Sequence, residues 1–588
     1  MSLYHSLAPF VVCVAVFVDA APGQTSPSDQ LTRLIDEAWD FDMREQPLFA
    51  TRVGDHRFND RLPSVSVADS QRRRKTKQAF LKRLAAIDRA KLPRSDQINY
   101  DIFRRLTANE VREYGFKSYL IPITNRAGFH ISFPELRRSA PLKTTVDYEN
   151  YIARLKAFDR YARQHVEIMR VGIKQGIVLP DIVLAGFRAP IETHLVDDPT
   201  ESLLYEPFRK FPQSVSQQQQ KRLAAAGRKA IIESVVPGYR RFLTFMEKEY
   251  SPAARGSIGA SALPGGRAFY RHRVRKYTTL DLSPEQVHQT GLVEVKRIRA
   301  EMQQIIEKVK FKGDHAAFIK HLRTDPRFYP KTPEQLMKEV AFILKQMDGE
   351  LPRLFKTLPR TPYGLRRIPD YIAPRTTSAY YQQPAGDGSR GGFYYLNTYN
   401  LKSRPLFEME ALSFHEAVPG HHLQLALQQE MTGLPKFRRF AGFTAFVEGW
   451  ALYAERLGLE VGFYQDPYSD FGRLSFEMWR ACRLVVDTGI HYFGWTRRQA
   501  INYMAANTAL SLHNITAEVD RYISWPGQAL AYKTGELKIR ELRARAEKKL
   551  GKAFDIREFH EIILGSGSVP LGVLEENVDE YIEAALKP

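Results

Sequence analysis

Hydrophobic residues recur at helical spacing through most of the 588-residue chain. Ser283-Pro284-Glu285-Gln286 has the sequence of a capping box with proline at the first helical position, and it predicts a helix running towards Lys310. Thr332-Pro333-Glu334-Gln335 has the same form, and apolar residues follow it every three or four positions. Residues 147–175 and 216–250 are further long helical candidates. The pattern therefore predicts a mainly α-helical protein.

One region departs from the helical pattern. Residues 371–400 are rich in Tyr, Gly, Pro and Thr, which favour strands and turns. Within it, Thr377–Tyr381 and Phe393–Thr398 are predicted to form a pair of antiparallel strands. We expect a large helical body with a small antiparallel sheet just before the helix that contains His415.

The N-terminus has the pattern of an export signal. Leu7–Val18 is an almost unbroken apolar run, too short for a membrane span but typical of a signal peptide. We expect residues 1–20 to be removed and the protein to be periplasmic or secreted. Cys482 is then the only cysteine, so no intrachain disulfide can form. No later run approaches 18 apolar residues, and we expect no integral membrane association after signal removal.

The chain is strongly basic, with 86 Lys and Arg against 66 Asp and Glu and a formal charge of +20. Arg72–Lys75 and Arg271–Lys276 are local clusters, but the excess is spread along the chain. No nucleic-acid-binding motif accompanies it, so we expect no nucleic-acid partner. A solvated basic surface in loose contact with an anionic cell envelope is the simpler interpretation.

The strongest chemical signal begins at His415-Glu416. In the zinc-peptidase pattern His-Glu-x-x-His, two histidines one turn apart bind the metal and the glutamate activates water. Here position 419 is proline, and the next histidines are His421 and His422. On a straight helix His421 lies about 600° round from His415, and His422 lies roughly 10 Å further along the axis. A straight helix therefore suits neither residue as the second ligand.

Pro419 and Gly420 offer a way round this difficulty. Proline removes a backbone donor and glycine adds conformational freedom, so a bulge or kink is expected. Widening the turn by two residues brings His421 to the usual place of the second histidine. We therefore favour His421 as the second ligand, with His422 as the alternative.

Glu448 is the predicted third ligand. It lies in Phe446-Val447-Glu448-Gly449-Trp450-Ala451, within an apolar helical pattern, and Glu455 follows on the same face as a partner for a ligating imidazole. Two histidines and one glutamate leave a fourth position for water, as a catalytic Zn²⁺ requires, although such ligands also accept Mn²⁺ or Co²⁺.

These residues have two other interpretations. Histidines on helices are more often surface or core residues than ligands, yet burying so many polar groups together is costly unless they are paired or metal-bound. A helical di-metal carboxylate site requires Glu-x-x-His pairs. Pro419 follows Glu416 and Ala451 follows Glu448 at that spacing, so the pattern is missing.

Over nearly the whole mature chain the sequence resembles the bacterial family called domain of unknown function 885. The segments that carry the resemblance are Val53-Gly54-Asp55, Tyr380–Thr398, His415–Gln424, Glu448–Ala451, Arg521-Tyr522, Pro526–Ala529 and Tyr532. The family is similar to helical His-Glu-x-x-His metallopeptidases, which implies a helical body with a cleft and hydrolysis of peptide or amide bonds. We expect an N-terminal helical part, 21–280, and a metal-site catalytic part, 281–588, within one bilobal unit.

The segments that carry the resemblance also contain groups suited to holding a substrate. Strand Phe393–Thr398 could pair with an extended peptide by β-augmentation or simply pack its aromatic rings on the helical body. A tyrosine hydroxyl or an arginine after the metal helices could stabilise an oxyanion. The candidate substrate-binding residues are Arg390, Tyr394, Tyr395, Asn397 and Gln528, and the candidate oxyanion residues are Arg521, Tyr522 and Tyr532.

These expectations combine into one mechanism. His415, His421 and Glu448 hold Zn²⁺, and Glu416 takes a proton from the attacking water and passes it to the leaving amine. Two other functions use the same residues. One is hydrolysis of a non-peptide amide, and the other is a non-catalytic exported protein that binds a metal or peptide. Glu416 argues against the latter, because a structural metal site has no need of an unligated carboxylate beside it.

Overall fold

The computed structural model describes residues 26–370, 372–385, 388 and 390–587. The predicted signal peptide, 1–20, lies outside the described residues. Helices make up most of the described chain, joined by short 3-10 and π turns, and three short strands accompany them. The expectation of a mainly helical protein is confirmed. No described helix is long and apolar enough to cross a membrane.

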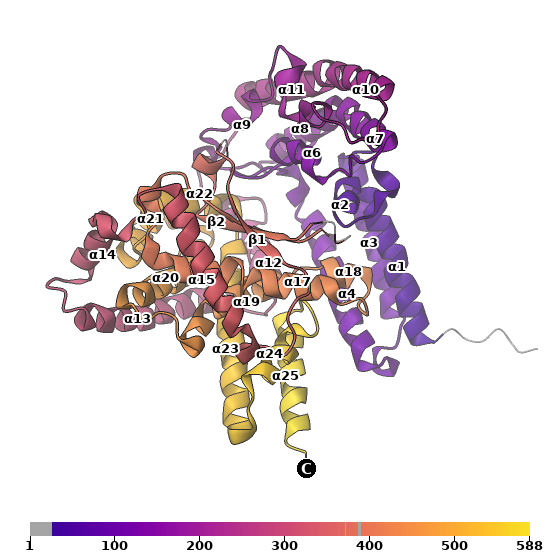
Figure 1. Ribbon diagram of the computed structural model, residues 1–588. Helices are drawn as coiled ribbons and strands as arrows, with labels where there is room; N and C mark the ends of the chain where they lie inside the picture. The colour runs from indigo at the N-terminus through magenta and orange to yellow at the C-terminus, as the bar shows by residue number, and fades with distance from the viewer. Residues whose placement is uncertain (1–25, 371, 386–387, 389, 588) are drawn as a thin grey trace, which may run out of the picture.

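The N-terminal helices form two groups (Figure 1). α1, α3 and α4 pack together along one side, whereas α7, α8, α10 and α11 form a layer at the top of the view. The bounds are α1 (Pro27–Glu45), α2 (Pro47–Arg52), α3 (Val67–Ala85), α4 (Arg94–Gly115), α5 (Phe129–Ser132), α6 (Leu136–Ser139), α7 (Thr145–Lys156), α8 (Phe158–Lys174), α9 (Ala189–Glu192), α10 (Gln217–Ala230) and α11 (Val236–Phe245).

The remaining helices build the body around a central buried helix, α20. α13 packs along α20, and α19 packs along α23. The bounds are α12 (Gly266–Thr278), α13 (Pro284–Lys308), α14 (His315–Thr324), α15 (Pro333–Leu354), α16 (Met409–Glu416), α17 (His421–Glu430), α18 (Lys436–Phe440), α19 (Thr444–Leu457), α20 (Pro467–His491), α21 (Arg497–Asn507), α22 (Leu512–Ser524), α23 (Ala531–Leu550), α24 (Ile556–Leu564) and α25 (Leu571–Ala585).

The sheet has three strands in the order β1-β3-β2. β2 (Ala379–Gln382) pairs antiparallel with β3 (Gly392–Leu396), as predicted. β1 (Tyr363–Arg367) was not predicted, and it pairs parallel with β3. The expectation of a purely antiparallel sheet is therefore wrong. Since β3 is the central strand, both of its edges are already paired.

The predicted helix starts agree with the structure in most cases. Ser283 caps α13 in a reciprocal capping box with Gln286. Thr332 caps α15, but the Gln335 side chain accepts from Lys331 rather than from the cap residue. Residues 217–250 are helical throughout, with two π turns. The predicted helix over 147–175 is divided at Ala157 into α7 and α8.

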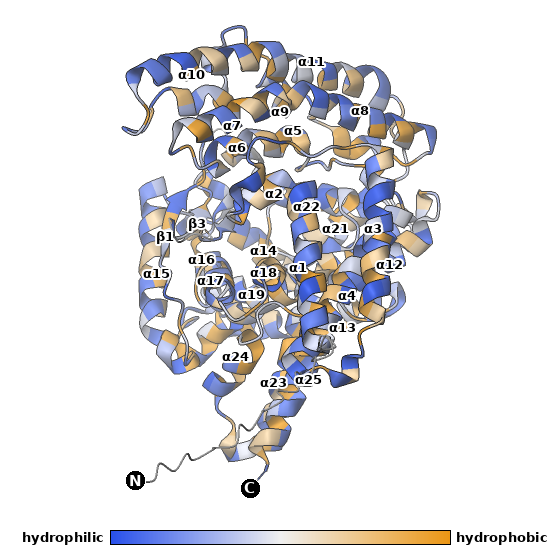
Figure 2. Cartoon of the chain, turned by 90° about the vertical axis from the view of Figure 1, so that its right-hand side faces the viewer, coloured by the Kyte–Doolittle hydropathy of each residue, from blue (hydrophilic) through white to orange (hydrophobic). Residues whose placement is uncertain are grey.

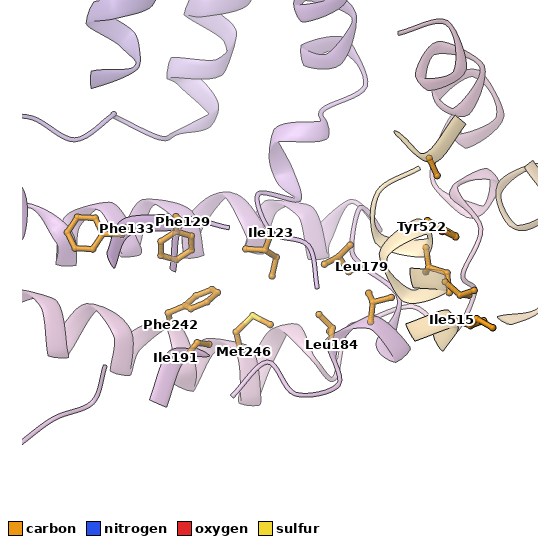
Figure 3. Packing of buried hydrophobic residues seen from close by; sticks show 14 of the residues in the cluster. Ile123, Phe129, Phe133, Leu179, Leu184, Ile191, Phe242, Met246, Ile515 and Tyr522 are labelled. Carbon is orange, nitrogen blue, oxygen red and sulfur yellow. The ribbon is translucent and has the colours of Figure 1, made fainter. Parts of the chain in front are cut away.

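Two large clusters of buried side chains form most of the core. The first runs from the N-terminal layer, where Phe129 and Phe133 face Phe242, towards Ile515 in α22 (Figure 3). It includes Cys482 of α20. All residues of α20 from Phe471 to His491 are buried. The second surrounds α16, α19 and α23. Figure 2 shows hydrophilic and hydrophobic residues on the same helices, as amphipathic packing requires.

Candidate metal centre

The His415 segment is built from two helices rather than one bulged helix. α16 ends at Glu416, residues 417–420 form a turn, and α17 begins at His421. The predicted interruption at Pro419 is therefore present, but it breaks the helix completely. Because α17 is a separate helix, the rotation of about 600° that a single straight helix would place between His415 and His421 does not apply. The break allows the two imidazoles to approach each other.

Close packing holds this turn in place. A Cβ added at Gly420 would lie 2.1 Å from the carbonyl oxygen of His415, so only glycine fits there. The indole Nε1 of Trp450 in α19 donates a hydrogen bond of 2.9 Å to the carbonyl oxygen of Pro419. The backbone N–H of His422 donates to the carbonyl of Ala417 at 3.0 Å. The turn is thereby fixed to α19, the helix that carries Glu448.

His415, His421 and Glu448 lie together, with one potential ligand atom from each within 4.8 Å of the others. The Nε2 atoms of both histidines lie 3.5 Å from the same atom, Oε2 of Glu448. Two ligands of one tetrahedral zinc, each at 2.0–2.1 Å, are separated by about 3.4 Å. Oε2 is buried and has no hydrogen-bond partner among the described residues. The three residues therefore fit a shared Zn²⁺.

Glu455 holds His415 from behind. The Nδ1 atom of His415 lies 2.8 Å from Oε1 of Glu455, which is about two helix turns beyond Glu448 on α19. A carboxylate on Nδ1 leaves Nε2 free to ligate and fixes the ring, as carboxylate partners do in many metal sites. Arg480 of α20 lies 3.3 Å from the same carboxylate. The predicted support role of Glu455 thus has a geometric basis.

The electrostatics of the group show how tightly it is coupled. Burial alone would lower the pKa of His415, but the adjacent carboxylates of Glu448 and Glu455 outweigh it and raise the pKa to about 9. Burial would raise the pKa of Glu448, yet the two imidazoles hold it well below its usual value. Burial also raises the pKa of Glu416. The two imidazoles and the carboxylates therefore stabilise one another's charged forms, and Arg480 lies beside them through Glu455.

A pocket of about 450 Å³ opens onto this group. His415, Glu416, His421 and Glu448 all line it. So do three of the residues predicted to bind substrate or oxyanion, namely Arg521, Gln528 and Tyr532. Its volume is within the range of small-molecule sites. The structure therefore brings the predicted ligands, the predicted base and these polar groups to one cavity.

Tyr522, the other predicted oxyanion residue, does not line the pocket. It is fully buried beside Ile515 (Figure 3). Its hydroxyl accepts hydrogen bonds from Trp479 Nε1 at 3.0 Å and from Arg483 Nε at 2.9 Å. Tyr522 therefore supports residues around the pocket instead of contacting a substrate.

The other predicted substrate-binding residues also lie elsewhere in the described structure. Tyr394 and Asn397 are fully buried, and the Asn397 amide donates to the carbonyl oxygens of residues 373, 376 and 377. Tyr395 stacks on Tyr380 with ring centroids 4.9 Å apart. Arg390 donates to the carbonyl oxygens of its own hairpin. Of the two roles left open for Phe393–Thr398, pairing with a peptide does not fit the structure, because β1 and β2 occupy both edges of β3.

The pocket instead uses residues that the sequence reasoning missed. Residues 377–381 and Gln383, on and beside the edge strand β2, form one wall. Arg126, Arg480 and Arg483 also line it. Arg480 and Arg483 interrupt the apolar run Met478–Val486 of α20, and a charged residue in such a run is a signal that could have identified them.

His422 is turned away from the metal group. Its Nδ1 shares a hydrogen bond of 2.8 Å with the Tyr381 hydroxyl, and its ring lies 4.8 Å from that of Tyr363. Burial lowers its pKa to about 4. Of the two candidates for the second ligand, His421 is the one that the structure brings to His415 and Glu448.

These features define a class: a mainly helical protein with two histidines and a glutamate gathered in a polar pocket. The model of a family described as bacterial proteins of unknown function, domain of unknown function 885, matches residues 47–578. The chain belongs to this family. No functionally curated protein matches it.

Two solved structures share the fold. A "putative lipoprotein" from Colwellia psychrerythraea is 29% identical, with a TM-score of 0.89 over 95% of this chain and 100% of the other. A "putative lipoprotein of unknown function" from Shewanella oneidensis is 19% identical, with a TM-score of 0.69 over 94% of this chain and 99% of the other. The whole described architecture is therefore shared with these proteins.

Proposed function

We propose that this protein is a zinc-dependent hydrolase that cleaves peptide bonds. The observation that carries the proposal is the convergence of His415 Nε2 and His421 Nε2 on one unpartnered oxygen of Glu448, 3.5 Å from each. Glu416 lies beside these ligands in the same pocket. Three protein ligands with an adjacent free carboxylate form the arrangement of a catalytic zinc site, whereas structural sites are closed by four protein ligands.

The chain's own residues have distinct roles in this reaction. When bound, zinc would act as a Lewis acid that polarises the substrate carbonyl and makes water more acidic. The Glu416 carboxylate takes a proton from the attacking water and passes it to the leaving nitrogen. Tyr532, whose ring lines the pocket, donates its hydroxyl to the carbonyl oxygen as negative charge develops. Glu455 keeps the His415 ring in place throughout.

The edge strand β2 supports a peptide as the substrate. Residues 377–381 line the pocket, and the edge of β2 opposite β3 has no partner strand among the described residues. An extended peptide can add to such an edge through backbone hydrogen bonds. This wall takes the substrate-binding role that the sequence assigned to β3.

The test is hydrolysis by the zinc-loaded protein and by its Glu416→Gln variant. We expect the variant to retain zinc, because Glu416 is not a ligand, and to lose about a hundredfold or more of the peptidase rate. The control is Glu339→Gln, the same substitution at an exposed position of α15, which should retain both the zinc and the peptidase rate. The measurements are metal content by mass spectrometry and cleavage of a peptide mixture. Cleavage by Glu416→Gln at the wild-type rate would exclude the general-base role.

We further propose that the protein is exported. The apolar run Leu7–Val18 supports this, as do the two structural relatives described as lipoproteins. Mass spectrometry of the protein from its native envelope should find the first residue near Ala21. A protein that still carries residues 1–20 and is found in the cytoplasmic fraction would contradict export.

A further inference from the structure

Four arginines line the pocket beside the metal group: Arg126, Arg480, Arg483 and Arg521. Three of them share a single carboxylate. Arg126, Arg483 and Arg521 lie 3.2, 3.1 and 2.9 Å from the oxygens of Glu518. The fourth, Arg480, pairs with Glu455. Among these six side chains there is an excess of two positive charges.

Part of this cluster has donors without acceptors. Arg483 is only 3% exposed, and its Nη1 has no hydrogen-bond partner among the described residues. The Nε of Arg480, also buried, is unpartnered too. The Arg483 guanidinium lies between two rings, 4.4 Å from the centroid of Trp479 and 4.3 Å from that of Tyr532. Stacking keeps its plane fixed while one donor remains unused, and buried donors are rarely left unpaired.

The cluster directly adjoins the reacting centre. Tyr532 contacts Arg483 on one side and interacts electrostatically with Glu448 on the other. Arg480 reaches His415 through Glu455. Between a group bound at the arginines and the predicted metal ligands there would therefore be only one or two intervening side chains. This spacing matches a substrate whose charged end is close to the bond that is cleaved.

A second cavity, of about 250 Å³, adjoins the first pocket at Glu448. It shares Gln383, Leu425, Val447 and Glu448 with the first pocket and extends to Phe440. The four arginines line only the first pocket, whereas a single arginine, Arg439, lines the second. A substrate chain thus has room to continue past Glu448 into a cavity with one arginine, whereas the positive charge is concentrated in the first pocket.

We propose that the arginine cluster binds the C-terminal carboxylate of a peptide, so that the enzyme is a carboxypeptidase that releases a short C-terminal fragment. This inference rests on the proposed peptidase function. A guanidinium donates two parallel hydrogen bonds to a carboxylate, which explains the unused Arg483 donor. In the reaction water supplies OH to the acyl carbon and H to the nitrogen as the C–N bond breaks. The released fragment retains its carboxylate at the arginines.

Binding of three matched peptides tests the carboxylate site separately from catalysis. The protein is the zinc-loaded full mature chain with Glu416→Gln, and the method is calorimetry. The probes are an N-acetylated tetrapeptide with a free C-terminus, its C-terminal amide, and the amide with glutamate as last residue. We expect the free acid to bind about tenfold or more tightly than either amide. Equal binding of acid and amide, or no binding of the acid, would overturn the proposal. A glutamyl amide that matches the free acid would assign the arginines to acidic side chains instead.

Variants locate the effect. Arg483→Gln should reduce the acid-to-amide affinity ratio to near one. Arg323→Gln, whose arginine donates to backbone carbonyls outside the pocket, should preserve the ratio. If Arg483→Gln does not fold, Arg126→Gln replaces it, because that side chain is 27% exposed at the pocket. An unchanged ratio in both pocket variants would overturn the assignment.

Cleavage by the wild-type protein separates this inference from the function on which it rests. Selective cleavage of the free acid, with N-acetylation tolerated, supports both. Equal kcat/KM for acid and amide refutes the carboxylate site and leaves the hydrolase. Preferential binding of the acid with no cleavage of any peptide refutes the hydrolase and leaves the carboxylate site.

Discussion

His421 and His422 are neighbours in the sequence but have different surroundings in the structure. His421 is the first residue of α17, and its Nε2 faces Glu448 at 3.5 Å. His422 faces the sheet and bonds to the Tyr381 hydroxyl. One residue along a helix turns a side chain by about 100°, which is enough to separate a ligand from a packing residue.

This difference gives a test of the metal group. Purified wild-type protein should contain about one zinc per chain, and His415→Ala and His421→Ala should each lose most of it, because two remaining ligands bind zinc weakly. His422→Ala is the matched control and should keep its zinc. Metal content by mass spectrometry after dialysis against free zinc is the measurement. Equal loss from His421→Ala and His422→Ala would mean that the effect comes from damage to α17.

At this scale the sequence predicts the grouping of His415, His421 and Glu448 better than it predicts the rest of the pocket. His415, His421 and Glu448 could be recognised because their chemistry is rare at such spacing in apolar helices. Tyr394 and Asn397 were assigned to substrate binding because strand residues beside a site often serve that role. Their actual environment depends on the register between β3 and β1, and no local feature of residues 363–367 marks that strand as a partner.

The helices α19 and α23 approach each other very closely at two glycines. A Cβ on Gly449 would lie 2.5 Å from the Cα of Gly535, and a Cβ on Gly535 would lie 1.8 Å from the carbonyl oxygen of Ala445. Glu448 precedes one glycine and Tyr532 lies one turn before the other. The contact therefore sets the distance between a predicted metal ligand and the wall of the pocket.

Gly535→Ala should separate these helices. We expect the free energy of unfolding to fall by about 1–3 kcal/mol, as overpacking does, and zinc occupancy to fall with it. Gly349→Ala, on the exposed face of α15 with no atom within 4 Å, should raise the stability by about 0.5–1 kcal/mol. Denaturant unfolding and metal analysis measure both changes. Equal stability of the two variants would contradict the role given to the contact.

Among the elements, the predictable ones have strong local signals. The start of α13 could be placed because Ser283 and Gln286 cap it reciprocally. The boundary between α7 and α8 at Ala157 could not, since no proline or glycine marks it. Pro419 predicts the interruption after Glu416. The conformation of the turn also depends on the hydrogen bond from Trp450, which is 31 residues from Pro419 in the chain. Long-range contacts of this kind decide what local patterns leave open.

Across the whole molecule, α20 connects the parts that matter for the site. It contributes Arg480 and Arg483 to the pocket and packs along α13. It also places Cys482 between those arginines and within the first core cluster. The N-terminal layer shares that cluster with α20 and α22, so segments far apart in the sequence have a common interior.

The position of Cys482 has a practical consequence. Its sulfur is fully buried, and burial raises the pKa of the thiol, so the reactive thiolate is suppressed while the core is closed. Once residues 1–20 are gone it is the only thiol in the chain. A thiol reagent should therefore label the folded protein orders of magnitude more slowly than the urea-unfolded protein. Labelling at the unfolded rate would contradict the closed core. Otherwise the modification of a single sulfur atom records how often the interior of the protein opens to solvent.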